Sequence, residues 1–159
     1  MAVRPLDHTS CALVLKYTVQ AAGTVTKGMC VKLGTVETDV LSASTNEKAI
    51  GIALESGVAG DIVNIAMLGC GGIVPVLIGT GGSTHGEHAI CTTNGVTNQT
   101  LGGGTTVKYI VGTFLETCVV GDYGAMVPNG RLASGAPCGR AHHHPPPPCP
   151  VRSETERWA

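Results

Sequence analysis

The stretch IGIALESGVAGDIVNIAMLG, residues 50–69, decides the fold of this chain. A second stretch, VGTFLETCVVGDYGAMVPNG at residues 111–130, repeats it with seven of twenty positions identical, where ordinary residue usage gives about one or two by chance. Each copy has an apolar run ending at a glutamate, a turn of small residues closing on Gly-Asp, and a second apolar run. This order of strand and turn signals is typical of a β-hairpin. Its repetition predicts a β domain built on an internal duplication.

The repeated glycines and carboxylates are predicted to be structural turn residues. An aspartate in a turn can accept hydrogen bonds from backbone amides, and a glycine can adopt the positive φ that many turns need. The repeated carboxylates could also form a catalytic acid pair, but a duplicated hairpin duplicates its turn residues in any case. The structural turn set is Gly51, Glu55, Gly60, Asp61, Gly112, Glu116, Gly121 and Asp122.

The rest of the central region is typical of short strands. Apolar residues alternate from Leu13 to Val19 and again from Met29 to Leu33, which indicates half-buried strands. Pro75, within IVPVLIG at 73–79, predicts an edge strand or a bulge because proline cannot donate to a β-ladder. Residues 79–106 are rich in Gly and Thr and predict loops around one short strand at 89–91. His85-Gly86 resembles Lys27-Gly28, which would extend the duplication upstream.

These patterns predict an all-β fold, since no long stretch has apolar residues at helical spacing. We expect a small Gly-rich barrel or sandwich of about eight to ten strands. The predicted boundaries are an N-terminal arm at 1–10, a β domain at 11–133 with pseudo-repeats at about 24–69 and 82–130, and a Pro-rich C-terminal arm at 134–159.

The C-terminal arm has almost no aliphatic residues, and its four consecutive prolines enforce an extended polyproline II conformation. Trp158 stands near its end, and tryptophan and arginine are frequent interface anchors. The alternative is an unfolded tail with an incidental tryptophan. The partner-contact residues predicted on the two arms are Arg4, Pro145, Pro146, Pro147, Pro148, Arg152, Arg157 and Trp158.

Composition limits the classes of partner. Charged residues are 13% of the chain, against about 25% in ordinary soluble domains, so much of the surface is expected to be covered by other subunits. The net charge of −1 gives no electrostatic footprint for nucleic acid. The first residues lack the apolar run of a signal peptide, and no apolar run is long enough to span a membrane. We therefore expect synthesis in a host cytoplasm.

The candidate reactive residues do not form a site of known chemistry. The seven cysteines show no CxxC and are predicted to be mostly small buried side chains. Cys138, Cys149 and the tract His142–His144 hold metal-binding atoms, but their spacing fits no zinc template. The sequence does not show whether Cys138 or Cys149 forms a disulfide, or whether the His142–His144 tract binds a metal. The sequence predicts no catalytic residue, cofactor or metal, because no phosphate-binding glycine motif and no activated nucleophile is present.

One enzyme-related alternative concerns Lys48. Glu47-Lys48-Ala49, preceded by TVTKGMCV and VETD, looks like the hairpin that presents the modified lysine in lipoyl or biotinyl carrier domains. Those domains are about half the length of this chain and keep the lysine on a tight hairpin, whereas Lys48 here leads straight into an apolar run.

The runs AAGTVTKGMCVKLG, AIGIALESGVAGDIVNIAMLGCGGIVPV and KYIVGTFLETCVVGDYGAMVPNG resemble the capsid cement, or head decoration, proteins of tailed bacteriophages over residues 15–130. The resemblance implies a β-rich homotrimer without catalytic residues on the outside of the expanded head. There it would clamp neighbouring major capsid protein subunits and contact adjacent cement trimers. The Pro-rich arm is not part of that family's pattern. Another virion component, a head fibre base or a tail subunit, is the alternative.

Overall fold

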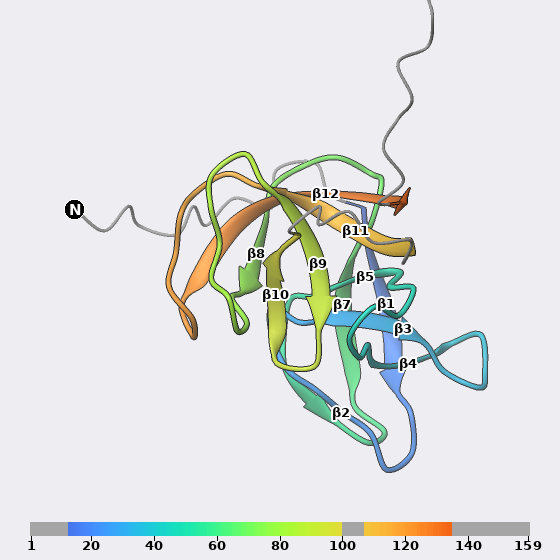
Figure 1. The fold of residues 1–159 in the computed structure, drawn as a ribbon. Coiled ribbons are helices and arrows are strands. Elements are labelled where there is room, and N and C mark those ends of the chain that lie inside the picture. Colours follow the sequence, from blue (N-terminus) through green and yellow to red (C-terminus); the bar gives the residue numbers. More distant parts are fainter. Residues whose placement is uncertain (1–12, 100–106, 135–159) are drawn as a thin grey trace, which may run out of the picture.

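The structure, a computed structural model, describes residues 13–99 and 107–134 (Figure 1). Every regular element in this part of the chain is a strand, which confirms the all-β prediction. The strands are β1 (Val14–Val19), β2 (Thr24–Val25), β3 (Cys30–Leu33), β4 (Asp39–Ser42), β5 (Gly51–Ala53), β6 (Gly57–Val58), β7 (Ile62–Met67), β8 (Val74–Leu77), β9 (His88–Thr92), β10 (Gly95–Asn98), β11 (Val107–Phe114) and β12 (Tyr123–Ser134).

The first half of the chain forms a closed five-stranded barrel in the order β1-β4-β3-β5-β7. All neighbouring strands in it are antiparallel except β1 and β4, whose short parallel pairing at Val19 and Val40 closes the barrel. The short strands β2 and β6 pair beside it, with Val25 opposite Gly57. Branched residues that alternate along these strands fill the interior, including Val31, Val63 and Ile65.

The second half repeats this arrangement. Its five strands follow the order β10-β9-β11-β12-β8, and a parallel bridge between Ile78 and Val96 joins the two outer strands where β1 and β4 pair in the first half. An antiparallel bridge between Ser83 and Cys118 stands where β2 pairs with β6. The chain therefore folds as two β units of the same topology, rather than one barrel of eight to ten strands.

Backbone hydrogen bonds show that the duplication extends upstream of the repeated hairpins. Gly28 donates to the Ala53 carbonyl at 2.7 Å, and Gly86 donates to the Phe114 carbonyl at 2.9 Å. Both glycines have positive φ, 80° and 82°. These equivalent bonds and backbone conformations agree with the predicted correspondence of His85-Gly86 with Lys27-Gly28.

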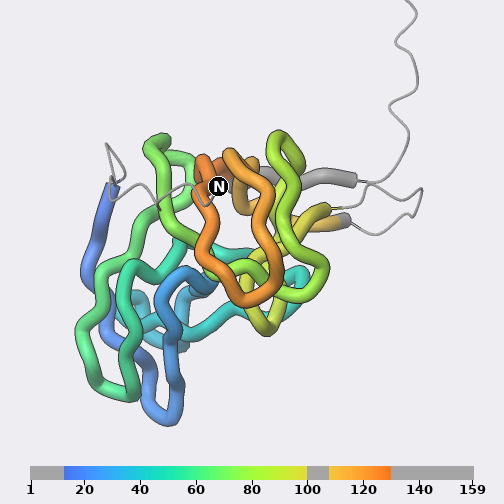
Figure 2. The backbone as a smooth tube through the Cα atoms, turned by 90° about the vertical axis from the view of Figure 1, so that its left-hand side faces the viewer, coloured from blue at the N-terminus to red at the C-terminus, as the bar shows by residue number. Residues whose placement is uncertain are grey.

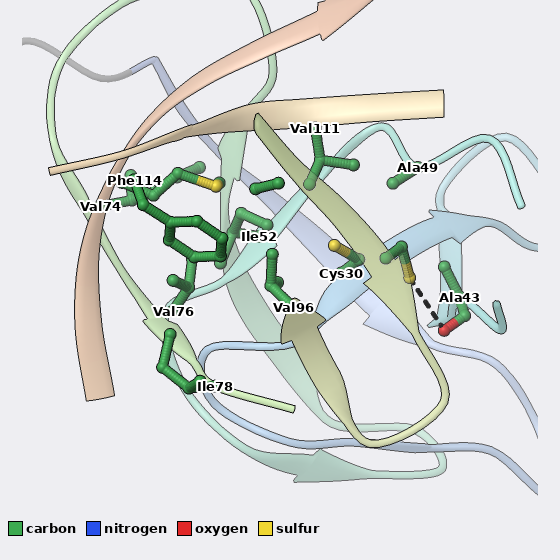
Figure 3. Packing of buried hydrophobic residues seen from close by; sticks show 14 residues of the cluster. Cys30, Ala43, Ala49, Ile52, Val74, Val76, Ile78, Val96, Val111 and Phe114 are labelled. Atoms are coloured by element: carbon green, nitrogen blue, oxygen red, sulfur yellow. Dashed lines mark hydrogen bonds between the residues drawn. The ribbon is translucent and has the colours of Figure 1, made fainter. Parts of the chain in front are cut away.

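The two halves share one hydrophobic core (Figure 3). Cys30, Ala43 and Ile52 of the first half lie in the same buried cluster as Val76 and Phe114 of the second. The Cys91 thiol donates to the Ala43 carbonyl at 3.3 Å across this junction. Because apolar side chains from both halves exclude water together, we expect them to hold a fixed position relative to each other.

Three details differ from the sequence-based expectation. Residues 79–106 contain two strands, β9 and β10, where one was predicted. The strand β4 was not predicted at all. Leu13 and Leu15 are exposed, although their alternation predicted a half-buried strand, because β4 pairs only with the last residues of β1. Pro75 lies in β8, an outer strand of the second sheet, as predicted.

Candidate functional site

The described surface carries apolar side chains on two equivalent turns. We call residues 54–62, which connect β5, β6 and β7, the first apolar turn, and residues 115–123, which connect β11 to β12, the second apolar turn. Both belong to the repeated hairpins from which the duplication was predicted. Figure 2 shows the second turn at the front of the molecule, in orange, and the first turn at the lower left, in green.

A glutamate carboxylate accepts a backbone hydrogen bond at the base of each turn. The Glu55 carboxylate accepts the backbone N–H of Asn64 at 2.6 Å, and the Glu116 carboxylate accepts that of Ala125 at 2.6 Å. Beside it, Leu54 donates to the Asn64 carbonyl and Leu115 to the Ala125 carbonyl, each at 2.9 Å. Hydrogen bonds to an ionised carboxylate are stronger than neutral ones. Each glutamate therefore helps to fix the start of the turn relative to the following strand of its own unit.

The Gly-Asp pair closes each turn. Gly60 and Gly121 have φ of 89° and 88°, a conformation that L side chains rarely adopt. The Asp61 carboxylate accepts the Val58 N–H at 2.9 Å. Gly60 donates to the Val19 carbonyl at 2.9 Å, and Gly121 donates to that of Ile78 at 2.8 Å. Each turn is thereby hydrogen-bonded to the end of the first strand of its own unit, at β1 or directly after β8.

Gly51 and Gly112 are not turn residues, which corrects that prediction. They lie inside β5 and β11. A Cβ on Gly51 would approach the Ala66 carbonyl oxygen to 2.6 Å, and a Cβ on Gly112 would approach the Val127 carbonyl oxygen to 2.6 Å. The repeated glycine is therefore required by the close approach of the neighbouring strand, and not by a turn conformation.

The tips of the turns expose apolar side chains. In the first turn Val58 and Ile62 are 59% and 67% exposed; in the second, Val119 and Val120 are 68% and 57% exposed. Val58 and Val119 occupy the same place in the duplication, and so do Ile62 and the exposed Tyr123. Single exposed apolar residues are ordinary on protein surfaces, but groups of them mark interaction sites.

Lys27 lies between the two turns. Its backbone N–H donates to the Ser56 hydroxyl at 2.9 Å, and its carbonyl accepts the Tyr123 hydroxyl at 3.4 Å. The ammonium group lies 6.0 Å from the centre of the Tyr123 ring. His85 makes the corresponding bond in the second half, to the Thr117 hydroxyl at 3.1 Å. These contacts fix the first turn against the loop that also supports Tyr123.

Three of the duplicated carboxylates have backbone partners. Glu55, Glu116 and Asp61 each accept a backbone amide of their own hairpin, so the structural reading of these residues accounts for their repetition. Within residues 13–99 and 107–134, no group of three or more His, Cys, Asp or Glu side chains is placed to hold a metal ion.

The four cysteines in the described segments are free thiols. Cys30 and Cys91 are buried, as predicted, while Cys70 is exposed and Cys118 is partly buried. A hydrogen bond with Cys91, and then burial, raises the pKa of the Cys30 thiol well above its usual range. Burial, followed by the nearby Glu116 carboxylate, raises the pKa of Cys118. Cys30 and Cys118 therefore stay protonated at neutral pH and are poor nucleophiles.

Lys48 does not lie at the tip of a hairpin. It belongs to the connection from β4 to β5, and these two strands pair with opposite sides of β3. The preceding Glu47 pairs with Lys32 at 2.6 Å and accepts the Ser44 N–H at 2.7 Å. The resemblance to a lysine-presenting carrier hairpin is therefore wrong for this segment.

The predicted arm contacts lie outside the described residues. This applies to Cys138, Cys149 and His142–His144, and to the partner-contact set of Arg4, Pro145, Pro146, Pro147, Pro148, Arg152, Arg157 and Trp158. Among the residues that are described, no helix is long and apolar enough to cross a membrane.

The exposed residues of the turns were missed from the sequence, although the identity of Val58 and Val119 within the repeat was a visible signal.

We expect Glu116→Ala to destabilise the protein more than Glu55→Ala. The N–H that Glu116 accepts belongs to the buried Ala125, which water reaches poorly, so its loss should lower the free energy of unfolding by about 1.5–3 kcal/mol. The bond of the exposed Glu55 is replaced by water, and about 1 kcal/mol is expected. Urea denaturation of both variants measures this. An equal or larger loss for Glu55→Ala would contradict the account of the two bonds.

Comparison with known proteins gives a likeness of fold. No protein-family model matches this chain, and no curated protein matches its sequence. A crystal structure of the head fiber gp8.5 N base of bacteriophage phi29 is similar, with a TM-score of 0.54 and 17% sequence identity. The match covers 74% of this chain and 95% of that one. This chain therefore has a fold of the kind found in that head fiber base.

Proposed function

We propose that this chain is a non-enzymatic structural protein of a phage virion. It binds the outer surface of the expanded head and stabilises the head by clamping neighbouring subunits of the major capsid protein. The observation that carries the proposal is the duplicated β unit, which presents one apolar turn twice on a single body. The fold likeness to a phage head fiber base supports placement on a head.

The physical mechanism is selective binding to one state of the shell. A protein that binds the expanded lattice and not its precursor shifts the equilibrium toward the expanded state by mass action. Each chain has two equivalent contact surfaces, and a bound chain brings the second close to the lattice once the first is engaged. Linked contacts of this kind give strong attachment from weak individual ones.

Further parts of the proposal concern assembly. A homotrimer would multiply the contacts per particle and cover part of this weakly charged surface. The arms add contacts to the capsid or to neighbouring trimers through Arg4, Pro145–Pro148, Arg152, Arg157 and Trp158. Neither nucleic acid nor membrane is a partner in this proposal.

The second candidate function is the base of a head fibre. It is favoured by the fold comparison, since the likeness covers 95% of the head fiber gp8.5 N base of bacteriophage phi29. Both candidates place the β units on the head surface. They differ in whether the bound protein only covers the capsid joints or also carries a projecting part.

Cosedimentation with phage heads tests the proposal. Purified chain is mixed with expanded heads assembled without it and, in parallel, with unexpanded heads of the same capsid protein. We expect saturable binding to expanded heads at a fixed multiple of the capsid subunits, and at least tenfold weaker binding to unexpanded heads. A chain truncated after Ser134 keeps every described strand and should bind expanded heads with reduced affinity.

The outcomes separate the parts of the proposal. No binding to either kind of head would contradict attachment to the capsid. Equal binding to both would contradict stabilisation by selection of the expanded state. A truncated chain that binds as tightly as the full chain would contradict the arm contacts alone, because the β units are intact in both proteins.

A further inference from the structure

The two copies of the repeat differ at most positions, but both have an exposed valine at the same place. In the repeated stretches only seven of twenty residues are identical, and Val58 and Val119 are among them although both are largely exposed. Neither side chain contributes to the buried clusters. Burial in the core therefore does not account for an apolar residue at both positions.

The backbone holds the two exposed residues in the same way. Asp61 donates its N–H to the Val58 carbonyl at 2.9 Å, and Asp122 donates its N–H to the Val119 carbonyl at 3.3 Å. The Asp61 carboxylate is already engaged with the Val58 N–H. Each turn therefore presents apolar groups in a fixed conformation, on a scaffold whose two halves share a core.

We infer that the two apolar turns are equivalent plugs for apolar sockets on neighbouring, identical protein subunits. This inference rests on the proposed function and names the surface that carries it. Two copies of one contact at a fixed spacing fit a partner that presents the same socket repeatedly, as a shell of identical subunits does. The exposed residues that enter the sockets are Val58, Ile62, Val119, Val120 and Tyr123.

Polar substitutions that keep a β-branched side chain test the inference. Val58→Thr with Ile62→Thr alters the first turn, Val119→Thr with Val120→Thr alters the second, and a fourth variant combines all four changes. Threonine keeps the β-branching and the strand propensity of valine and has a hydroxyl in place of one methyl group. At position 62 it also lacks the terminal methyl group of isoleucine. Tyr123 is left in place because its hydroxyl binds the Lys27 carbonyl.

The matched control uses exposed apolar residues that are not duplicated. Leu33 and Val36 are 48% and 55% exposed and lie at or after the end of β3. In the second half a two-residue turn at 93–94 replaces this longer loop. Leu33→Thr with Val36→Thr should therefore leave binding unchanged.

Binding of each variant to shells assembled from the major capsid protein is measured by cosedimentation. Thermal unfolding and the oligomer mass in solution are measured on the same samples. We expect either two-residue variant to bind about tenfold more weakly than the unmodified chain. The reason is that each variant buries less apolar surface in the contact. The four-residue variant should bind about a hundredfold more weakly. Melting temperature and oligomer mass should not change.

Three results would overturn the inference. The first is a four-residue variant that binds within threefold of the unmodified chain. The second is an effect confined to one turn. The third is a changed oligomer mass, which would make the turns contacts between copies of this chain. Failure of the unmodified chain to bind shells would instead overturn the proposed function, so the two failures are distinguishable.

Discussion

Gly28→Ala is expected to lower the free energy of unfolding by more than about 3 kcal/mol. A Cβ at Gly28 would lie 2.5 Å from the backbone nitrogen of Leu77 and 3.1 Å from the carbonyl carbon of Val76, in β8 of the other half. These are backbone atoms in a paired strand and cannot rotate away. The φ of 80° adds about 1–2 kcal/mol for a residue with a Cβ. Urea denaturation followed by circular dichroism measures the loss.

The control for Gly28→Ala is Gly86→Ala. Gly86 holds the equivalent position in the second half with φ of 82°, but a Cβ there would meet nothing within 4 Å. Its substitution therefore includes only the cost of the left-handed conformation, about 1–2 kcal/mol. The difference between the two variants measures how tightly the halves are joined at Leu77. Equal losses would contradict the close contact between them.

Phe114→Ala is expected to lower the free energy of unfolding by about 3–5 kcal/mol. Phe114 is the only phenylalanine of the chain and is fully buried in the cluster to which both halves contribute (Figure 3). Alanine would leave a cavity at this junction. Domains of this size are stable by only about 5–15 kcal/mol, so the variant should unfold at a much lower urea concentration.

The same variant tests whether the halves unfold together. Because Phe114 lies in the shared cluster, its loss should shift a single cooperative transition seen by both circular dichroism and the fluorescence of the tyrosines. Phe114→Leu fills most of the space and should cost much less. Two separate transitions, with only one shifted by Phe114→Ala, would contradict the shared core.

The local signals in the sequence predicted the repeated hairpins well. Each has apolar runs separated by a Gly-Asp turn, and those residues act locally, through a backbone conformation and hydrogen bonds within a few positions. Pro75 predicted an outer strand for the same reason, because its missing N–H constrains pairing wherever it stands. The strand β10 was missed because GVTN has one large apolar residue and reads as a loop.

The arrangement of the strands could not be predicted from local patterns. The closure of the first barrel depends on a parallel pairing between Val19 and Val40, and no residue type signals which strand will be its partner. The strict need for Gly51 depends on Ala66 of β7, the neighbouring strand, which comes from a later part of the chain. Packing between distant segments also explains why Leu13 and Leu15 are exposed despite their alternating pattern.

The candidate surface was predicted in part. The repeated glutamates and aspartates were predicted to be structural, and Glu55, Asp61 and Glu116 each accept a backbone amide. The exposure of Val58 and Val119 was not predicted, because the sequence does not show whether an apolar residue in a turn region faces the core or solvent. The predicted contacts on the arms stay predictions, since they lie outside the described residues.

Each half of the chain is expected to contact a different, neighbouring capsid subunit. Electron cryomicroscopy of expanded heads saturated with the protein would show these contacts. We expect density for both β units on the outer surface, with the first apolar turn on one capsid subunit and the second apolar turn on its neighbour. Density in which only one unit touches the shell, or in which both units rest on a single subunit, would contradict the account.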